Sequence, residues 1–187
     1  TPMGFFHLLS QCSLDWSNVS ITLADERWVN ADHADSNEKL VRENLLINEA
    51  HRAQFISLKN SAQDALAGES GTEQALASVG TFTVLILGMG DDGHTASLFP
   101  GAEALPLGLD MNSGRTCIAV TPTAAPHQRI SMTLPRLLDS QQIIIHISGA
   151  GKHQVLEEAK AGDDVEALPI RAILNQQQAP LEIYWAK

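Results

Sequence analysis

The sequence predicts an α/β domain built on a mostly parallel sheet with helices on both faces. Candidate strands and candidate helices alternate along the chain. The candidate strands are continuous apolar runs rather than alternations of apolar and polar residues, as expected for strands buried on both faces. The length of 187 residues suits one such domain, so residues 1–187 are expected to form a single domain.

In the first half of the chain, apolar runs separated by capping residues predict three strands and three helices. Pro2 favours a helix that starts just after it, and Ser36 is one of several cap candidates before the second helix. Gly68 and Gly71 interrupt the third helix. The expected helices cover 3–9, 38–47 and 61–79, and the expected strands cover 19–24, 55–58 and 82–87.

The second half continues the alternation. Pro122 ends a strand over 117–120, and a helix is expected over 129–138, although Pro135 should end or kink it. Further on, the apolar pattern predicts strands over 143–147 and 181–185, and helices over 152–161 and 169–174.

Composition narrows the class of protein. With 22 acidic and 12 basic residues the formal net charge is −10, which argues against a nucleic-acid or anionic-membrane surface. Neither a signal peptide nor a membrane-spanning run is recognisable. Cys12 and Cys117 have no metal-ligand or disulfide spacing, so both are expected to be buried, reduced thiols. These observations favour a cytoplasmic enzyme.

A glycine-rich turn, Gly88-Met-Gly-Asp-Asp-Gly93, follows the apolar run over 82–87. Its G-x-G-x-x-G spacing also occurs in dinucleotide-binding loops, which need a long helix directly after the turn. Here Pro100 and Gly101 follow so closely that the helix after the turn could have at most about two turns. We therefore expect no nucleotide cofactor, and Gly88 and Gly90 are expected to let the backbone approach a small ligand.

His94 ends this turn and is the candidate general base. Asp92 lies two residues earlier, where its carboxylate can fix the imidazole tautomer. The alternative is a structural or solvated histidine. His146, in the middle of a predicted strand, is expected to be a core histidine. His7, His33, His51 and His153 have no ligand spacing, so no metal is expected.

Three cations, Arg27, Arg129 and Lys152, lie near the ends of predicted strands or in loops, where they suit an anionic ligand. Lys152 closes the turn that starts at Ser148, which follows a strand and opens a helix. Backbone N–H groups at such a helix start favour phosphate. The alternative for each cation is an ordinary surface ion pair.

Several of these segments resemble the 6-phosphogluconolactonase family, within the group that includes glucosamine-6-phosphate deaminase. Together they span nearly the whole chain in the family's order, and Pro126 to Arg129 with Ser131 is a weaker match. The segments that carry the resemblance are Asp25-Glu-Arg-Trp-Val29 with Ser36-Asn37, Gly88 to Gly101, and Ser148-Gly-Ala-Gly-Lys152.

The resemblance implies a Rossmann-like three-layer sandwich and hydrolysis of 6-phospho-D-glucono-1,5-lactone to 6-phospho-D-gluconate in the oxidative pentose phosphate pathway, without a cofactor. The deaminase continues past His94 to a catalytic glutamate, where this chain has Phe99, and it has Tyr where this chain has Arg27. Both positions favour the lactonase. The alternatives are a deaminase-like aldose–ketose isomerase and a non-catalytic sugar-phosphate-binding domain.

The resemblance also implies roles for individual residues. His94 is the catalytic base and Asp92 orients it, while Asp25 matches a catalytic aspartate of the deaminase. Family members begin with a further strand and helix and a Ser-Gly-Gly-x-Thr-Pro phosphate loop, of which only Thr1-Pro2 is present. The domain is therefore expected to be incomplete at its N-terminus. Its oligomeric state stays open. The expected substrate ligands are Arg27, Arg129, Lys152, Thr1, Gly88 and Gly90.

Overall fold

The computed structural model describes residues 2–187, and the expected phosphate ligand Thr1 lies outside them. Its α-helices are α1 (Met3–Ser10), α2 (Asn37–Asn44), α3 (Ala65–Leu76), α4 (Leu105–Leu109), α5 (Leu134–Leu138), α6 (Ala150–Lys160) and α7 (Ile170–Leu174). Two 3-10 helices, η1 (Trp16–Asn18) and η2 (Asn48–Arg52), join them. The strands are β1 (Ser20–Ile21), β2 (Asp25–Arg27), β3 (Gln54–Phe55), β4 (Leu85–Leu87), β5 (Cys117–Val120), β6 (Arg129–Met132), β7 (Ile143–Ser148) and β8 (Leu181–Ala186).

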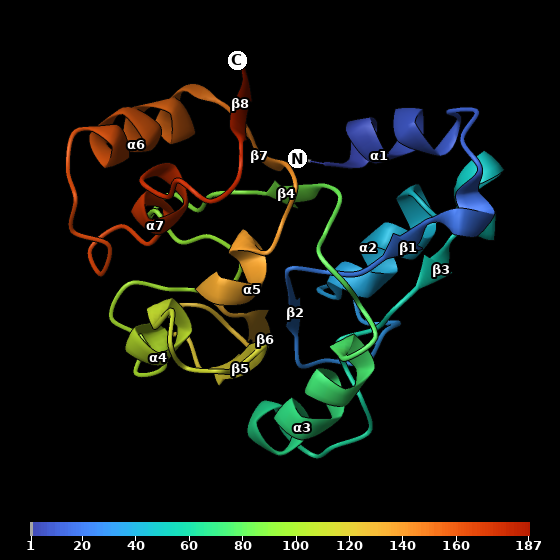
Figure 1. Ribbon diagram of the computed structural model, residues 1–187, viewed down its shortest axis with the longest axis horizontal. Helices are drawn as coiled ribbons and strands as arrows, with labels where there is room; N and C mark the ends of the chain where they lie inside the picture. Colours follow the sequence, from blue (N-terminus) through green and yellow to red (C-terminus); the bar gives the residue numbers. More distant parts are fainter. Residues whose placement is uncertain (1) are drawn as a thin grey trace.

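One of the sheets is parallel and has the strand order β4-β7-β8. On β7, Ile143, Ile145 and Ile147 are fully buried while the residues between them are half-buried. Figure 1 shows α6 and α7 beside this sheet, on the left of the view. The strand expected over 143–147 is thus confirmed, although only alternate residues of β7 are fully buried.

A second sheet is antiparallel, in the order β2-β6-β5. Here the expected helix over 129–138 is wrong in its first half, because Arg129–Met132 is the central strand β6. Ile130 and Met132 are buried between two neighbouring strands, and this pairing overrides local helix propensity. Pro135 lies in the first turn of α5, where its missing N–H costs nothing, so it opens a helix instead of ending one.

A third, short pairing joins β1 to β3 in parallel, next to α1 and α2 on the right of Figure 1. Asp25–Arg27, which follows the expected strand over 19–24, forms strand β2. Most strand pairings are parallel, and the predicted α/β class with a mostly parallel sheet is confirmed. The strands nevertheless form three separate hydrogen-bonded sheets.

Burial corrects two expectations. Cys117 is buried as predicted, but Cys12 is exposed because it follows the end of α1 in a turn at the surface. His146 is half-buried rather than a core residue, since it occupies an outward position of β7 and meets the ring of Phe5 edge-on. Among residues 2–187, none of the helices has the length and apolar character needed to cross a membrane.

Candidate active site

One cavity of about 860 Å³ brings together most of the residues singled out from the sequence. Its polar wall comes from β2, from the turn after β4, from β6 and from the first turn of α6. Asp92 lines a smaller cavity of about 300 Å³ that shares His94 with the large one. The predicted residues on the large cavity are Asp25, Arg27, Gly88, Gly90, His94, Arg129 and Lys152.

The turn after β4 orients His94. Gly93 adopts a left-handed backbone conformation with φ of 74°, which favours glycine, and the Gly90 N–H donates to the His94 carbonyl at 2.9 Å. The imidazole Nδ1 lies 2.5 Å from Asp92 Oδ1. Because an ionised carboxylate only accepts hydrogen bonds, Nδ1 carries the proton and Nε2 keeps its lone pair. The predicted pairing of Asp92 with His94 thus leaves a basic nitrogen unprotonated in the neutral ring.

Phe99 contacts both His94 and a cation of the site. Its ring centroid lies 4.1 Å from that of the imidazole, and the Arg129 guanidinium lies 5.0 Å from the same centroid. Phe99 is itself buried. The residue that distinguishes this chain from the deaminase pattern therefore packs directly against the candidate base.

Asp25 is held from three sides. Its Oδ2 accepts a hydrogen bond from Ser97 Oγ at 2.6 Å, and its Oδ1 lies 3.5 Å from Asn37 Nδ2. Arg129 approaches Oδ2 at 3.9 Å. The sequence reasoning missed Ser97, whose only signal was its place within the segment from Gly88 to Gly101. With these neighbours, Asp25 is fixed beside the cations.

Arg27 and Arg129 lie opposite each other in the register of β2 and β6. Arg27 donates to the Asp35 carbonyl at 3.2 Å and to Asn37 Oδ1. Arg129 is only 7% exposed, and its Nε has no hydrogen-bond partner. Burial lowers the pKa of Arg129, while the charge of Asp25 acts in the opposite direction. A buried donor without an acceptor is uncommon in folded proteins, so this arginine suits an anionic ligand.

Lys152 lies in the first turn of α6, after Gly149 with φ of 91°. The first N–H groups of a helix lack intrahelical acceptors and favour anions. Within residues 2–187, Lys152 makes no ion pair within 4.0 Å and lines the same cavity as the two arginines. Among the described residues, Lys152 therefore does not form the surface ion pair that was the alternative explanation for it.

Glu26 is a second residue that the sequence reasoning missed. It is buried, and its carboxylate accepts hydrogen bonds from three backbone N–H groups and from Ser36 Oγ. Burial raises its pKa, and the N–H groups of Asn37 and Glu38 lower it again. Glu26 thereby joins β2 to the start of α2, which fixes the segment that presents Arg27 and Asn37.

Comparison with known proteins agrees with this architecture. Residues 1–185 match the model of the family described as glucosamine-6-phosphate isomerases/6-phosphogluconolactonase. A 6-phosphogluconolactonase from Pseudomonas putida is 44% identical over 185 residues, which cover 99% of this chain and 75% of that protein. One from Rhizobium meliloti is 42% identical over 187 residues, covering 100% of this chain and 81% of that protein.

Solved structures extend the comparison to the fold. The crystal structure of a 6-phosphogluconolactonase from Shewanella baltica superposes with a TM-score of 0.97 at 46% identity, covering 100% of this chain and 79% of that one. A monomeric glucosamine-6-phosphate deaminase gives a TM-score of 0.79 at 18% identity, covering 100% and 81%, which shows the shared fold alone. The chain therefore belongs to the glucosamine-6-phosphate isomerase/6-phosphogluconolactonase family.

Proposed function

We propose that this protein hydrolyses 6-phospho-D-glucono-1,5-lactone to 6-phospho-D-gluconate. One observation carries the proposal: a histidine with an available Nε2 shares a cavity with a buried, unsatisfied arginine. That pairing provides a base that can deprotonate water and a hydrogen-bond donor for phosphate. The curated relatives at 44% and 42% identity are named for this activity. The partner is a small phosphorylated sugar lactone, handled in the cytoplasm as the sequence suggests.

In the proposed reaction, His94 Nε2 takes a proton from a water molecule as the water oxygen attacks the C1 carbonyl. The ester C–O bond to the ring oxygen then breaks, and the imidazolium returns the proton to that oxygen. Asp92 stabilises the imidazolium and holds the ring in place. A positioned general base of this kind contributes roughly 10²–10⁴-fold to the rate.

The 6-phosphate is proposed to bind Arg27, Arg129 and Lys152, together with the N-terminus of α6 and with Thr1. Charge-assisted hydrogen bonds from guanidinium groups to phosphate are strong and directional. Asp25 supports this arrangement through its contacts with Ser97 and Arg129. Its role here is to position the cation, whereas the isomerase alternative would make it an acid–base group.

Gly90 is proposed to have a steric role. Its N–H is already donated to the His94 carbonyl, so it does not serve as an oxyanion donor. A Cβ at this position would lie 2.2 Å from His94 Nδ1. Glycine therefore allows the imidazole and the substrate to approach the backbone, and Gly88 precedes it on the same cavity wall.

The test is a coupled assay in which 6-phosphogluconate is oxidised by its dehydrogenase and NADPH formation is followed. We expect turnover of the fresh lactone well above its spontaneous hydrolysis. His94→Ala should lose about 10²-fold or more of kcat while still binding 6-phosphogluconate in calorimetry. His51→Ala is the matched control, because His51 is exposed and lies outside the cavity. Near-wild-type turnover by His94→Ala would overturn the proposal.

Lys152→Ala tests the phosphate site separately. Loss of one cation should raise KM for the lactone and weaken 6-phosphogluconate binding, with a smaller effect on kcat. An effect confined to kcat would contradict the phosphate role. Binding of the product without any turnover would instead support the non-catalytic alternative, and release of ammonia from glucosamine 6-phosphate would support the deaminase.

A further inference from the structure

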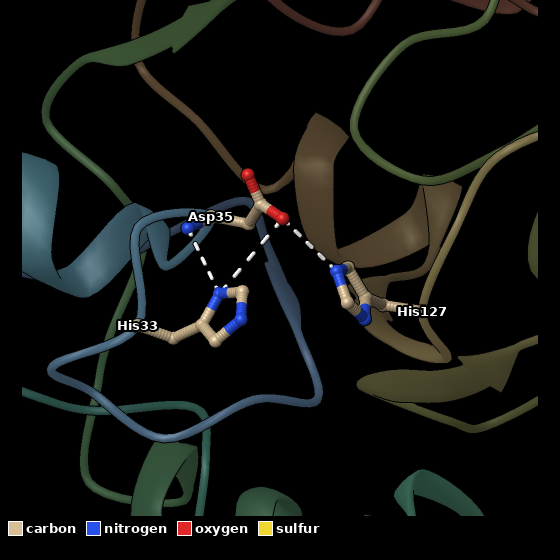
Figure 2. A group of neighbouring side chains, drawn as sticks. All are labelled: His33, Asp35 and His127. Carbon is tan, nitrogen blue, oxygen red and sulfur yellow. Dashed lines mark hydrogen bonds and ion pairs between the residues drawn. The ribbon is translucent and has the colours of Figure 1, made fainter.

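Two histidines and an aspartate meet at the surface between two loops (Figure 2). His33 and Asp35 belong to the loop that joins β2 to α2, and His127 belongs to the loop that joins β5 to β6. One donor atom from each residue can be chosen so that all three lie within 4.8 Å of one another. None of the three takes part in the proposed hydrolysis, so the cluster needs its own explanation.

The strand register explains why these loops meet. Arg27 and Arg129 are paired across β2 and β6, and Trp28 N–H donates to the Gln128 carbonyl at 2.7 Å. The residues that follow β2 and those that precede β6 therefore leave the sheet at the same end. The spacing of histidines along the sequence gives no hint of this, because the two loops are far apart in the chain.

Asp35 lies at the centre of the cluster, as Figure 2 shows. Its Oδ2 lies 3.0 Å from His127 Nε2 and 3.8 Å from His33 Nδ1. In a tetrahedral zinc site with bonds of about 2.0–2.1 Å, neighbouring ligand atoms are about 3.3 Å apart. These two separations lie on either side of that value, and the ligand atoms of all three residues lie within 4.8 Å of one another. Side-chain movements of about 1 Å would therefore bring the three atoms into the first coordination sphere.

From this geometry we propose that His33, Asp35 and His127 bind a divalent transition-metal ion, with Zn²⁺ as the best-suited ion. Two imidazoles and one carboxylate are a common three-ligand set for zinc, and water occupies the remaining positions. Imidazole nitrogens select against Mg²⁺ and Ca²⁺, which prefer oxygen ligands. The side chains are 46%, 54% and 30% exposed in the order His33, Asp35 and His127, so the ion can reach them from solvent.

Binding exchanges existing hydrogen bonds for metal bonds without any redox step. In the free protein His127 Nε2 carries the proton that it donates to Asp35 Oδ2. On binding, this proton is released to solvent and Nδ1 takes one up, so the ring stays neutral and Nε2 can coordinate the ion. His33 Nδ1 accepts the Asp35 N–H at 3.1 Å and gives up this bond to coordinate the ion. The carboxylate of Asp35 exchanges the hydrogen bond for a coordinate bond.

Calorimetric titration of the chelator-treated protein with ZnCl₂ tests the proposal. We expect saturable binding of one ion, and no saturable heat with MgCl₂. His33→Ala and His127→Ala should each weaken zinc binding roughly tenfold or more, and the double variant should abolish it. His51→Ala, an exposed histidine outside the cluster, should bind zinc like the wild type. Circular dichroism checks that each variant is folded.

A spectroscopic measurement identifies the ligands directly. Titration with Zn²⁺ should shift the imidazole resonances of His33 and His127 in NMR spectra and leave those of His94 in place. Unchanged zinc affinity in the double variant, or zinc shifts confined to His94, would overturn the proposal. The zinc experiments measure binding and the lactonase assay measures turnover. Failure of the zinc proposal would therefore leave the proposed lactonase activity standing, and failure of the lactonase assay would leave the zinc proposal standing.

Discussion

The ring of Phe99 packs against the imidazole of His94 with centroids 4.1 Å apart and ring planes inclined by 35°. Arg129 also contacts this ring. The buried ring of Phe99 therefore supports the imidazole of His94 on one side. The hydrogen bond from His94 Nδ1 to Asp92 holds the imidazole on another side. An imidazole fixed in this way loses little orientational freedom when the substrate binds.

Phe99→Leu should therefore lower kcat by about tenfold, with a smaller change in KM, because the imidazole can then rotate away from its position. The substitution keeps the site apolar and should cost only about 1 kcal/mol of stability. Steady-state kinetics and urea denaturation measure the two effects. Phe55→Leu is a suitable control, since Phe55 is half-buried and lies outside the cavity. Equal kcat values for Phe99→Leu and the wild type would contradict the positioning role.

Gly90→Ala should reduce activity strongly while the protein still folds. The new Cβ would lie 2.2 Å from His94 Nδ1 and 2.5 Å from Asp92 Oδ1, so the pair must separate. We expect a fall in kcat of about 10²-fold, similar to loss of a positioned base. Gly80→Ala provides the matched control, because a Cβ there has no neighbour within 4 Å. If both variants were fully active, the close approach at Gly90 would have no catalytic importance.

Glu26→Gln should destabilise the fold. The amide has nearly the same shape, but its NH₂ would face backbone N–H groups that now donate to the carboxylate. A buried donor left without an acceptor costs about 1–3 kcal/mol. Urea denaturation measures the free energy of unfolding, and Glu43→Gln, on the exposed face of α2, is the control. A difference below about 0.5 kcal/mol between the two variants would show that Glu26 is dispensable.

The two cysteines should differ in reactivity. Cys12 is exposed, whereas burial raises the pKa of the Cys117 thiol to about 12. Since the thiolate is the reactive form, iodoacetamide at neutral pH should modify one thiol in the native protein and both in denaturant. Mass spectrometry locates the modified residue. Rapid modification of Cys117 in a folded Cys12→Ser variant would be incompatible with this burial.

Apolar runs were sufficient to predict three of the longer strands. The expected strand over 117–120 coincides with β5, and the expected strands near 143 and 181 correspond to β7 and β8. In β5 and β7 the apolar side chains are buried, so local composition carries the information. In β8 most side chains are exposed or half-buried, and the apolar run still marks the strand. Arg129–Met132 could not be assigned in this way, because its strand state depends on partners on either side.

The candidate site was predictable where a residue type has a chemical reason to follow a strand. His94 with Asp92 and the three cations are of this kind, and Asp25, Arg27 and Lys152 now line one cavity with His94. Contacts between distant segments were not predictable. Ser97 meets Asp25 across 72 positions of sequence, and His127 meets Asp35 across 92. The pairing of β2 with β6 brings Asp35 to His127, whereas Ser97 reaches Asp25 from the segment after β4.

The pairing of β2 with β6 also has a consequence for the order of events in folding. Arg27 and Arg129 become neighbours only when two distant strands have found their correct register. A shift of one strand by one residue would turn one of the two side chains to the opposite face. The unfolded chain and partly folded forms without this register would therefore lack the proposed phosphate site. Phosphorylated ligands should bind the completed fold alone, and by mass action they protect it from unfolding.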